Sequence, residues 1–278
     1  ACRLAEGDAK VILLEAGPKD RDIRIHIPAA LRPLLYNEKV NWNYQTEPVE
    51  STAGRQVNLP RGKVLGGSSS INGMLYVRGN AADFDGWAQM GCRGWSYQDV
   101  LPYFQKSEAY KGGGDPAYRG DNGPLEVEDY RTILPLTHRF VKAAQQAGFS
   151  FTPDYNGAQQ EGVGYSQMTR RGRFRGSTAQ TYLRSARSNS KLQIVTDARA
   201  GTLMFEGRKC VGVTYRRGNQ KEKIRASKEI VLCGGAYNSP HLLQVSGIGP
   251  ASHLKEIGVD VLHDLPGVGS NLADHWGA

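Results

Sequence analysis

Residues 61 to 79, RGKVLGGSSSINGMLYVRG, contain the pattern best suited to binding chemistry. Consecutive Gly and Ser residues let the main chain approach a flat or anionic ligand closely, because no branched Cβ intervenes, and their N–H groups can form a concave cradle. Ser68 and Asn72 add short hydrogen-bonding side chains. The Gly, Ser and Asn run contains no acid, base or metal ligand, so we expect it to bind a ligand through its main chain. A plain Gly-rich turn is the alternative.

Glu15 is the second candidate, because it ends the apolar segment VILLE. In a dinucleotide site, an acid at the end of a strand bonds the ribose hydroxyls, roughly 20 residues after a G-x-G-x-x-G sequence. Such a G-x-G-x-x-G sequence would have to stand before Ala1, the first residue of the sequence. Two interpretations therefore stay open here: Glu15 is an ordinary strand-end residue, or the sequence is truncated.

Other kinds of catalytic site are disfavoured. The G-x-S-x-G elbow of serine hydrolases is absent, because Ser68 is followed by two further serines. The six histidines include no H-E-x-x-H sequence and no i, i+4 pair, so no metal site is predicted. The four cysteines lack C-x-x-C spacing, and we expect reduced, mostly buried thiols, with Cys233 inside the apolar run IVLC.

The net charge of +8 raises the question of a polyanionic partner. The densest basic run is RRGRFRG at 170–176, which we predict to be a solvated loop, because no nucleic-acid-binding signature accompanies it. No nucleic-acid partner is predicted. The sequence has no signal peptide and no apolar run of about 18 residues, which favours a cytoplasmic location and leaves peripheral membrane attachment open.

The elements that must position these residues follow from local patterns. ACRLAE reads as the end of a helix, and KVILLEAG as a strand buried on both faces of a parallel sheet. Residues 135–148 have helical spacing and a Gly stop. From residue 191, LQIVTD, GTLMFEG, CVGVTYRRG and KEIVLCGG predict strands. A helix should then begin with Asn238 or Ser239 as its cap and Pro240 in its first position.

Two long segments resemble the signatures of the glucose-methanol-choline (GMC) oxidoreductase family, FAD enzymes that oxidise alcohols. PRGKVLGGSSSINGMLYVRG at 60–79 is similar to the first signature and GAYNSPHLLQVSGIGP at 235–250 to the second. Shorter matches are VILLEAG, NWNYQTEP, STAQTYL, the β-rich block 191–235 and LPGVGSNLADH at 265–275. Within the family, the chain resembles the choline dehydrogenase-like, bacterial alcohol dehydrogenase branch most.

The resemblance implies an FAD site. Glu15 would hold the adenosine ribose, and the main chain of Ala200 would contact the adenine region. The residues expected along the pyrophosphate are Gly66, Gly67 and Ser68. Those expected at the edge of the isoalloxazine are Asn72, Gly73, Met74 and Leu75. The remaining cofactor-binding residues expected are Ala16, Gly17, Arg61 and Gly235. Some members attach FAD to a histidine directly before this Asn, but Ile71 stands here, so noncovalent FAD is expected.

The resemblance also implies the organisation of the chain. The expected fold is α/β, with an FAD-binding Rossmann-like domain interwoven with part of an α+β substrate-binding domain. We expect 1–124 and 173–278 to belong to the FAD-binding domain and 125–172 to the substrate-binding domain. Family members begin with a strand and G-x-G-x-x-G, and end with a catalytic His pair or His-Asn. Because both are missing, we interpret the sequence as an internal fragment, truncated at both ends and inactive alone.

The implied reaction is the oxidation of a primary alcohol, choline-like or aliphatic, to the aldehyde. A histidine would accept the hydroxyl proton while the hydride passes to flavin N5. No catalytic residue is assigned within the chain, and His275 belongs to a different motif. The electron acceptor, a quinone or oxygen, is not determined by the sequence. A lyase on the same scaffold and a non-enzymatic basic binding module are the alternatives.

Overall fold

The computed structural model describes residues 1–274. The chain divides into two compact units, unit 1 with residues 1–11 and 18–193, and unit 2 with residues 12–17 and those from 194 onward. The chain passes between the units three times: within β1 (Val11–Leu14), between Gly17 and Pro18, and within β8 (Leu192–Val195). Strands β1 and β8 pair with each other. The amide of Val11 donates to the carbonyl of Lys191 and that of Glu15 to the carbonyl of Val195, so the two strands are parallel.

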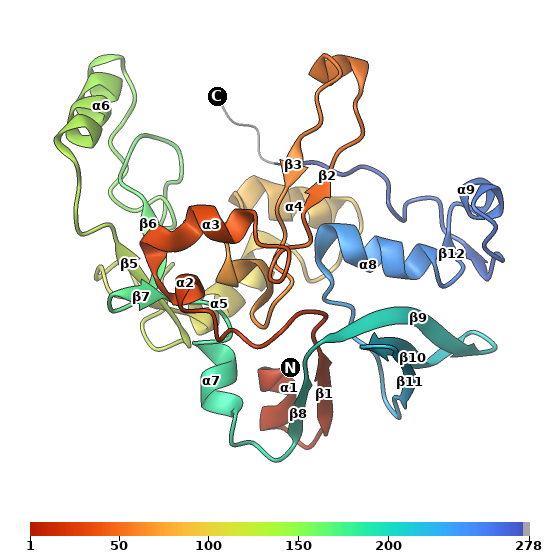
Figure 1. Ribbon diagram of the computed structural model, residues 1–278. Coiled ribbons are helices and arrows are strands. Elements are labelled where there is room, and N and C mark those ends of the chain that lie inside the picture. The colour runs from red at the N-terminus through yellow and green to blue at the C-terminus, as the bar shows by residue number, and fades with distance from the viewer. Residues whose placement is uncertain (275–278) are drawn as a thin grey trace. The chain divides into compact units, whose positions relative to one another are not determined.

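Unit 1 contains one four-stranded sheet, in the order β4-β5-β6-β7. Figure 1 labels β5, β6 and β7 of this sheet. The pair β4-β5 is parallel, and the other two pairs are antiparallel. Its strands are β4 (Glu108–Tyr110), β5 (Leu125–Asp129), β6 (Gln167–Arg171) and β7 (Phe174–Arg175). A separate antiparallel pair consists of β2 (Tyr44–Gln45) and β3 (Asn58–Leu59).

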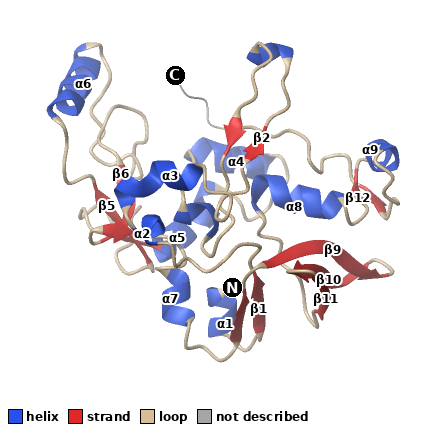
Figure 2. Cartoon of the chain, in the orientation of Figure 1, coloured by secondary structure: helices blue, strands red, loops and turns tan. Residues whose placement is uncertain are grey.

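Short helices and long loops make up the rest of unit 1 (Figure 2). The α-helices are α1 (Cys2–Glu6), α2 (Ile23–His26), α3 (Leu31–Leu35), α4 (Ala81–Gln89), α5 (Tyr97–Ser107), α6 (Pro135–Gln146) and α7 (Tyr182–Ala186). The 3-10 helices are η1 (Pro28–Ala30), η2 (Glu50–Thr52) and η3 (Gly67–Ser70). Five apolar residues form a buried cluster that joins the α2–α3 region to the Gly/Ser loop: Ile25, Leu34, Val40, Val64 and Ile71.

Unit 2 contains an antiparallel three-stranded sheet in the order β11-β10-β9. Its strands are β9 (Ala198–Glu206), β10 (Lys209–Arg217) and β11 (Gln220–Arg225). The other elements are α8 (Gly235–Gln244), α9 (Ala251–Glu256) and the parallel pair β12 (Ile248–Gly249) and β13 (His263–Asp264). Helix α8 packs against β9 (Figure 1).

Most of the elements predicted from local patterns are confirmed. These are α1, β1, α6 with the left-handed Gly148 two residues beyond its end, and β8, β9 and β10. The strand predicted at 228–235 is wrong, because residues 230–233 form no regular element. The third strand of the sheet is instead β11, a polar segment that the sequence analysis missed. It pairs with β10 across the turn at Gly218, so its backbone is satisfied without an apolar sequence.

The start of α8 was also predicted wrongly. The helix begins at Gly235, and Pro240 lies inside it. Ser239 therefore lies within the helix and is not its N-cap, which is Gly234. The Ser239 hydroxyl oxygen accepts a hydrogen bond from the amide of Gly234. The Asn-Ser-Pro sequence, typical of a helix start, therefore lies one turn into a helix that has already formed.

Two burial predictions are wrong. Ile12, in the centre of β1, is 42% exposed, although β1 was expected to be buried on both faces. Among the cysteines, all of them free, Cys2 is buried and Cys210 half-buried, but Cys92 and Cys233 are exposed. Burial depends on the layers that pack over a segment, and an apolar segment does not specify these layers. The domain boundaries at 124 and 172 stay a prediction.

In the described part of the chain, no helix combines the length and the apolar character that a membrane span requires.

Candidate functional site

The Gly/Ser loop, residues 61–76, is held in shape by its own serines. The Ser68 hydroxyl oxygen accepts from the amide of Gly62 at 3.0 Å, which closes the loop on itself. Ser70 donates to the carbonyl of Leu65 at 2.9 Å and is fully buried. The serines therefore shape the loop as well as lining it, and Ser68, which is exposed, keeps its own O–H free to donate outward.

A second segment, residues 167–179, holds the loop from the side. The amide of Thr169 donates to the carbonyl of Met74, and that of Tyr76 donates to the carbonyl of Gln167. Further along, the amide of Thr178 donates to the Ser69 hydroxyl at 3.0 Å. These contacts join residues about 100 positions apart, so the loop is fixed by tertiary structure and not by its glycines alone.

The predicted isoalloxazine-edge residues lie together at the end of this loop. Asn72, Gly73 and Leu75 are exposed, whereas Met74 is buried and adopts a left-handed backbone with φ of 64°. The Asn72 side-chain oxygen accepts from the amide of Met74 at 3.0 Å, which stabilises this uncommon conformation. Residues 72–75 therefore form a short, largely exposed segment in which a hydrogen bond within the loop fixes the orientation of the Asn72 side chain.

The predicted pyrophosphate residues and Arg61 lie at the other end of the loop. Gly66 and Gly67 have left-handed backbones, with φ of 95° and 57°. Arg61 is half-buried, and its amide donates to the Asn41 side-chain oxygen at 2.9 Å. Unit 1 therefore brings together all the residues that were predicted between 61 and 75.

Arg175 is a residue of this region that the sequence analysis missed. The basic run 170–176 was expected to be a solvated loop, but β6 and β7 form a hairpin there, and Arg175 is only 1% exposed. Its guanidinium donates to the side-chain and main-chain oxygens of Asn72, at 2.9 and 2.6 Å. No local pattern distinguishes Arg175 from its exposed neighbour Arg173, so only packing reveals it.

Glu15 lies in unit 2, at the carboxyl end of β1. Its carboxylate accepts from the amide of Gly17 at 2.8 Å, and the amide of Ala198 donates to its carbonyl. Burial raises the pKa of Glu15 to about 7, the negative charge of Asp197 adds to this effect, and the hydrogen bond from Gly17 opposes it. Its burial and its raised pKa make Glu15 a candidate functional residue of unit 2.

Unit 2 also contains the other residues that were predicted outside the loop. Ala16 is half-buried and Gly17 is buried; the carbonyl of Gly17 accepts from the amide of Asp197. Ala200 follows in β9, two residues after Ala198. Gly235 occupies the first turn of α8, with φ of 82°. The predicted residues therefore divide between the two units: those from 61 to 75 belong to unit 1, and Glu15, Ala16, Gly17, Ala200 and Gly235 belong to unit 2.

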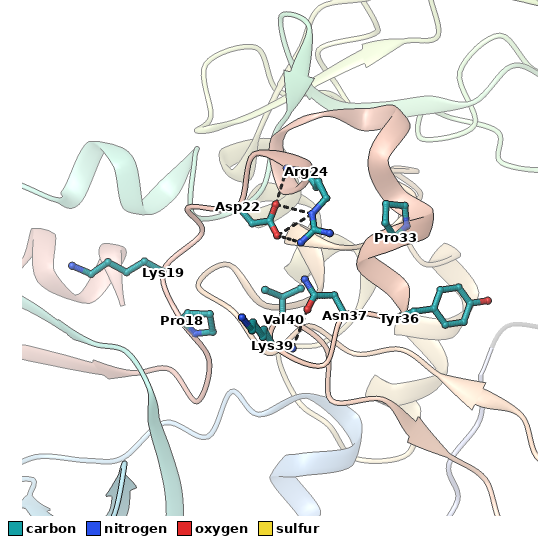
Figure 3. Close-up of a pocket in the computed structure, with 9 residues that line it drawn as sticks. All are labelled: Pro18, Lys19, Asp22, Arg24, Pro33, Tyr36, Asn37, Lys39 and Val40. Carbon is teal, nitrogen blue, oxygen red and sulfur yellow. Dashed lines mark hydrogen bonds and ion pairs between the residues drawn. The ribbon is translucent and has the colours of Figure 1, made fainter.

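A pocket of about 550 Å³ in unit 1 is lined by none of the predicted residues. In Figure 3, Asp22 and Arg24 form an ion pair at its edge, with the shortest N–O distance 2.5 Å. The lining residues are Pro18, Lys19, Asp22, Arg24, Pro33, Tyr36, Asn37, Lys39 and Val40. The Asp22 carboxylate is held in that ion pair and the pocket is lined by none of the predicted site residues, so we assign it no catalytic role. Residues 1–274 contain no cluster of three or more His, Cys, Asp or Glu able to hold a metal ion.

Comparison with known proteins defines the class. Residues 44–277 match the family model described as GMC oxidoreductase, and the chain belongs to this family. The oxygen-dependent choline dehydrogenase of Brucella ovis is 48% identical over 276 residues, which are 99% of this chain and 50% of that protein. The protein of the same name from Sinorhizobium medicae is 46% identical over 277 residues. The chain spans about half the length of the curated relatives it matches.

Solved structures agree with this assignment. The pyridoxine 4-oxidase from Mesorbium loti superposes with a TM-score of 0.90 at 34% identity, over 95% of this chain and 52% of that one. An FAD-dependent oxidoreductase from Chaetomium thermophilum gives 0.86 at 31% identity, over 93% and 46%. The predicted resemblance and the α/β fold class are thereby confirmed.

Proposed function

We propose that this chain supplies FAD-binding residues of an oxidoreductase that oxidises a primary alcohol, choline-like or aliphatic, to the aldehyde. The observation that carries the proposal is the Gly/Ser loop: it is clamped by residues 167–179 and exposes Ser68 and Asn72 at its surface. The relatives named choline dehydrogenase support the alcohol, and a name containing "oxygen-dependent" favours oxygen over a quinone as acceptor.

The described residues fit a flavin nucleotide. A Cβ at Gly62 would lie 2.3 Å from the main chain of Gly67, so the loop is as tight as a main-chain cradle requires. Two polar atoms on the clamping segment, Nη2 of Arg175 and Oγ of Ser177, are buried without a hydrogen-bond partner. The guanidinium of Arg175 therefore places an uncompensated positive charge beside the loop, which suits an electron-rich cofactor.

The roles of the residues are part of this proposal. Gly66, Gly67 and Ser68 contact the pyrophosphate, Asn72 to Leu75 line the edge of the isoalloxazine, and Glu15 bonds the ribose hydroxyls. The further contacts are assigned to Ala16, Gly17, Arg61, Ala200 and Gly235. When bound, FAD supplies the hydride acceptor that no side chain provides.

The direct test uses the full-length protein, purified with FAD and kept free of oxygen. Choline and a series of aliphatic primary alcohols are added, and the loss of the oxidised flavin absorbance is recorded. We expect at least one of them to bleach the flavin in a single turnover, and readmitted oxygen to restore it. A flavin that no alcohol reduces would contradict the proposed reaction.

Neither alternative, a lyase or a basic binding module, is favoured by a contact among residues 1–274.

The location in the cell belongs to the same proposal. We propose a cytoplasmic protein, with peripheral membrane attachment left to experiment. Fractionation of cells that express the full-length protein, with and without a high-salt wash of the membranes, separates these cases, because salt weakens electrostatic attachment to a membrane surface.

We expect the flavin to be bound noncovalently. The position before Asn72 is Ile71, which is 2% exposed, belongs to the apolar cluster of unit 1 and carries no nucleophile. Denaturing the full-length holoprotein with acid should therefore release all yellow colour into the supernatant. Colour that stays with the precipitated protein would contradict this expectation.

We expect Glu15→Ala to weaken FAD binding about tenfold to hundredfold, because a charge-assisted hydrogen bond contributes roughly 1.5 to 3 kcal/mol. Titration of the full-length apoprotein with FAD measures the dissociation constant. Glu256→Gln, which changes an exposed carboxylate of unit 2, is the matched control and should leave it unchanged. An unaltered constant for Glu15→Ala would show that Glu15 does not hold the ribose.

The raised pKa of Glu15 adds a pH dependence. Ribose hydroxyls donate best to the ionised carboxylate, so FAD affinity should rise as the pH rises through about 7 and stay flat in Glu15→Gln.

The free energy of unfolding of the apoprotein should fall over the same rise in pH. Because folding raises the pKa from 4.5, the stabilising contribution of protonated Glu15 is fully present below pH 4.5 and is lost as the pH rises through about 7.

A further inference from the structure

Arg175 carries a buried positive charge that no carboxylate among the described residues neutralises. Its side chain makes four hydrogen bonds, all to uncharged oxygens. Nε donates to the carbonyl of Ile25 at 2.9 Å, and Nη1 donates to the carbonyl of Ser69 at 3.4 Å and to both oxygens of Asn72. It forms no ion pair with any residue between 1 and 274. Desolvation by burial lowers the pKa of Arg175 to about 10, without an opposing charge.

An uncompensated buried cation is costly, and proteins normally pair such charges. Nη2 of Arg175 is the part of the guanidinium that has no partner. Oγ of Ser177, two residues further on, is also buried and without a partner, and Ser177 is fully buried. Both atoms are closed off from solvent in this ligand-free structure, so the charge of Arg175 acts on the neighbouring Gly/Ser loop through space and through its hydrogen bonds, without direct contact with a ligand.

The hydrogen bonds of Arg175 also determine how Asn72 is presented. The Asn72 side-chain oxygen accepts from Nη1 of Arg175 at 2.9 Å and from the amide of Met74 at 3.0 Å. Both partners are donors, so this atom must be the oxygen, and the NH₂ group of the amide has to point elsewhere. Because Asn72 is exposed, its NH₂ is available to a ligand, with the charge of Arg175 behind it.

We propose that Arg175 is a positioning residue, which fixes Asn72 with its NH₂ as a donor to the flavin and whose charge favours the reduced form of the cofactor. The inference rests on the proposed function. In that reaction a hydride leaves the alcohol carbon for the flavin and the hydroxyl proton leaves separately, so the products are the aldehyde, one proton and a flavin with one additional negative charge. A nearby fixed cation stabilises this additional charge.

The experiment uses the full-length holoprotein and three substitutions. Arg175→Met removes the charge and the hydrogen bonds, and Arg175→Lys keeps the charge but loses the planar fork that reaches Ile25 and Asn72 together. Arg173→Met removes the same charge from an exposed position of the same hairpin and is the matched control. The readouts are the midpoint potential of the bound flavin and the dissociation constant of oxidised FAD.

We expect Arg175→Met to weaken binding of the reduced flavin at least tenfold more than that of the oxidised flavin, which lowers the midpoint potential by about 30 mV for a two-electron couple. Arg175→Lys should keep most of the potential but bind oxidised FAD about tenfold more weakly, because Asn72 is no longer held. Arg173→Met should change neither. These results would support the inference.

An unchanged potential in Arg175→Met, with FAD still bound, would overturn it. If Arg175→Met does not fold, the FAD dissociation constants of three other variants test the inference: Arg175→Lys, Asn72→Ala and the variant that combines these two substitutions. Losses of FAD affinity that are not additive support positioning through Asn72, and additive losses contradict it. Failure of the unsubstituted protein to bind FAD would overturn the proposed function itself, and with it this inference.

Discussion

We expect Glu108→Gln to lower the free energy of unfolding by about 3 to 5 kcal/mol, because it removes the carboxylate that pairs with the buried Arg78 and one of the two that pair with the buried Arg119, the other being Asp154. Glu108 is fully buried in β4. One of its oxygens accepts from Nη2 of Arg78 at 2.6 Å and from Nε of Arg119 at 2.8 Å. The side chains of both arginines are at most 3% exposed, so water cannot replace the lost charge.

Glu126→Gln is the matched control for this prediction. Glu126 lies on β5, the strand that pairs with β4. Within residues 1–274 its one ion pair is to Arg171, 3.7 Å long, with both side chains more than a third exposed. Such a surface pair contributes less than about 1 kcal/mol. Denaturant unfolding of the full-length variants, monitored by fluorescence, measures both changes. If Glu108→Gln costs no more than Glu126→Gln, the buried cluster does not stabilise unit 1.

Gly62→Ala should be nearly as disruptive, for a steric reason. Its Cβ would lie 2.3 Å from the main-chain carbon and oxygen of Gly67 and 2.6 Å from the amide nitrogen of Ser68. No side-chain rotation relieves a clash with main chain, so the loop must open. We expect a loss of at least about 3 kcal/mol in stability and the loss of measurable FAD binding.

Gly67→Ala separates this clash from ordinary glycine strain. Gly67 has φ of 57°, but a Cβ there would meet no atom within 4 Å. The cost should be the left-handed backbone alone, about 1 to 2 kcal/mol. Thermal unfolding and FAD titration of the two full-length variants give the comparison. Equal losses for both glycines would mean that the close approach at Gly62 does not shape the loop.

The sequence predicted those parts of the molecule that depend on local chemistry. The Gly/Ser loop, the helix at 135–148 and the strands from 192 to 217 each carry their signal within a short stretch. Turn glycines and apolar spacing reflect interactions between residues that are close in the sequence, so they predict these elements without knowledge of the segments that pack against them. The strand β11 was missed for the opposite reason: its residues are polar, and it exists because β10 offers hydrogen bonds along its edge.

The sequence by itself determined the family, through two long signatures in the family's order. It also located the Gly/Ser loop at 61–76, because the first signature covers it. Only the tertiary structure decided which charges are buried. Glu108, Arg78 and Arg119 meet although 30 and 11 residues separate the arginines from the glutamate. Arg175 reaches Asn72 across 103 positions. Burial and pairing of a charge depend on which distant segments pack around it, and no short pattern contains that information.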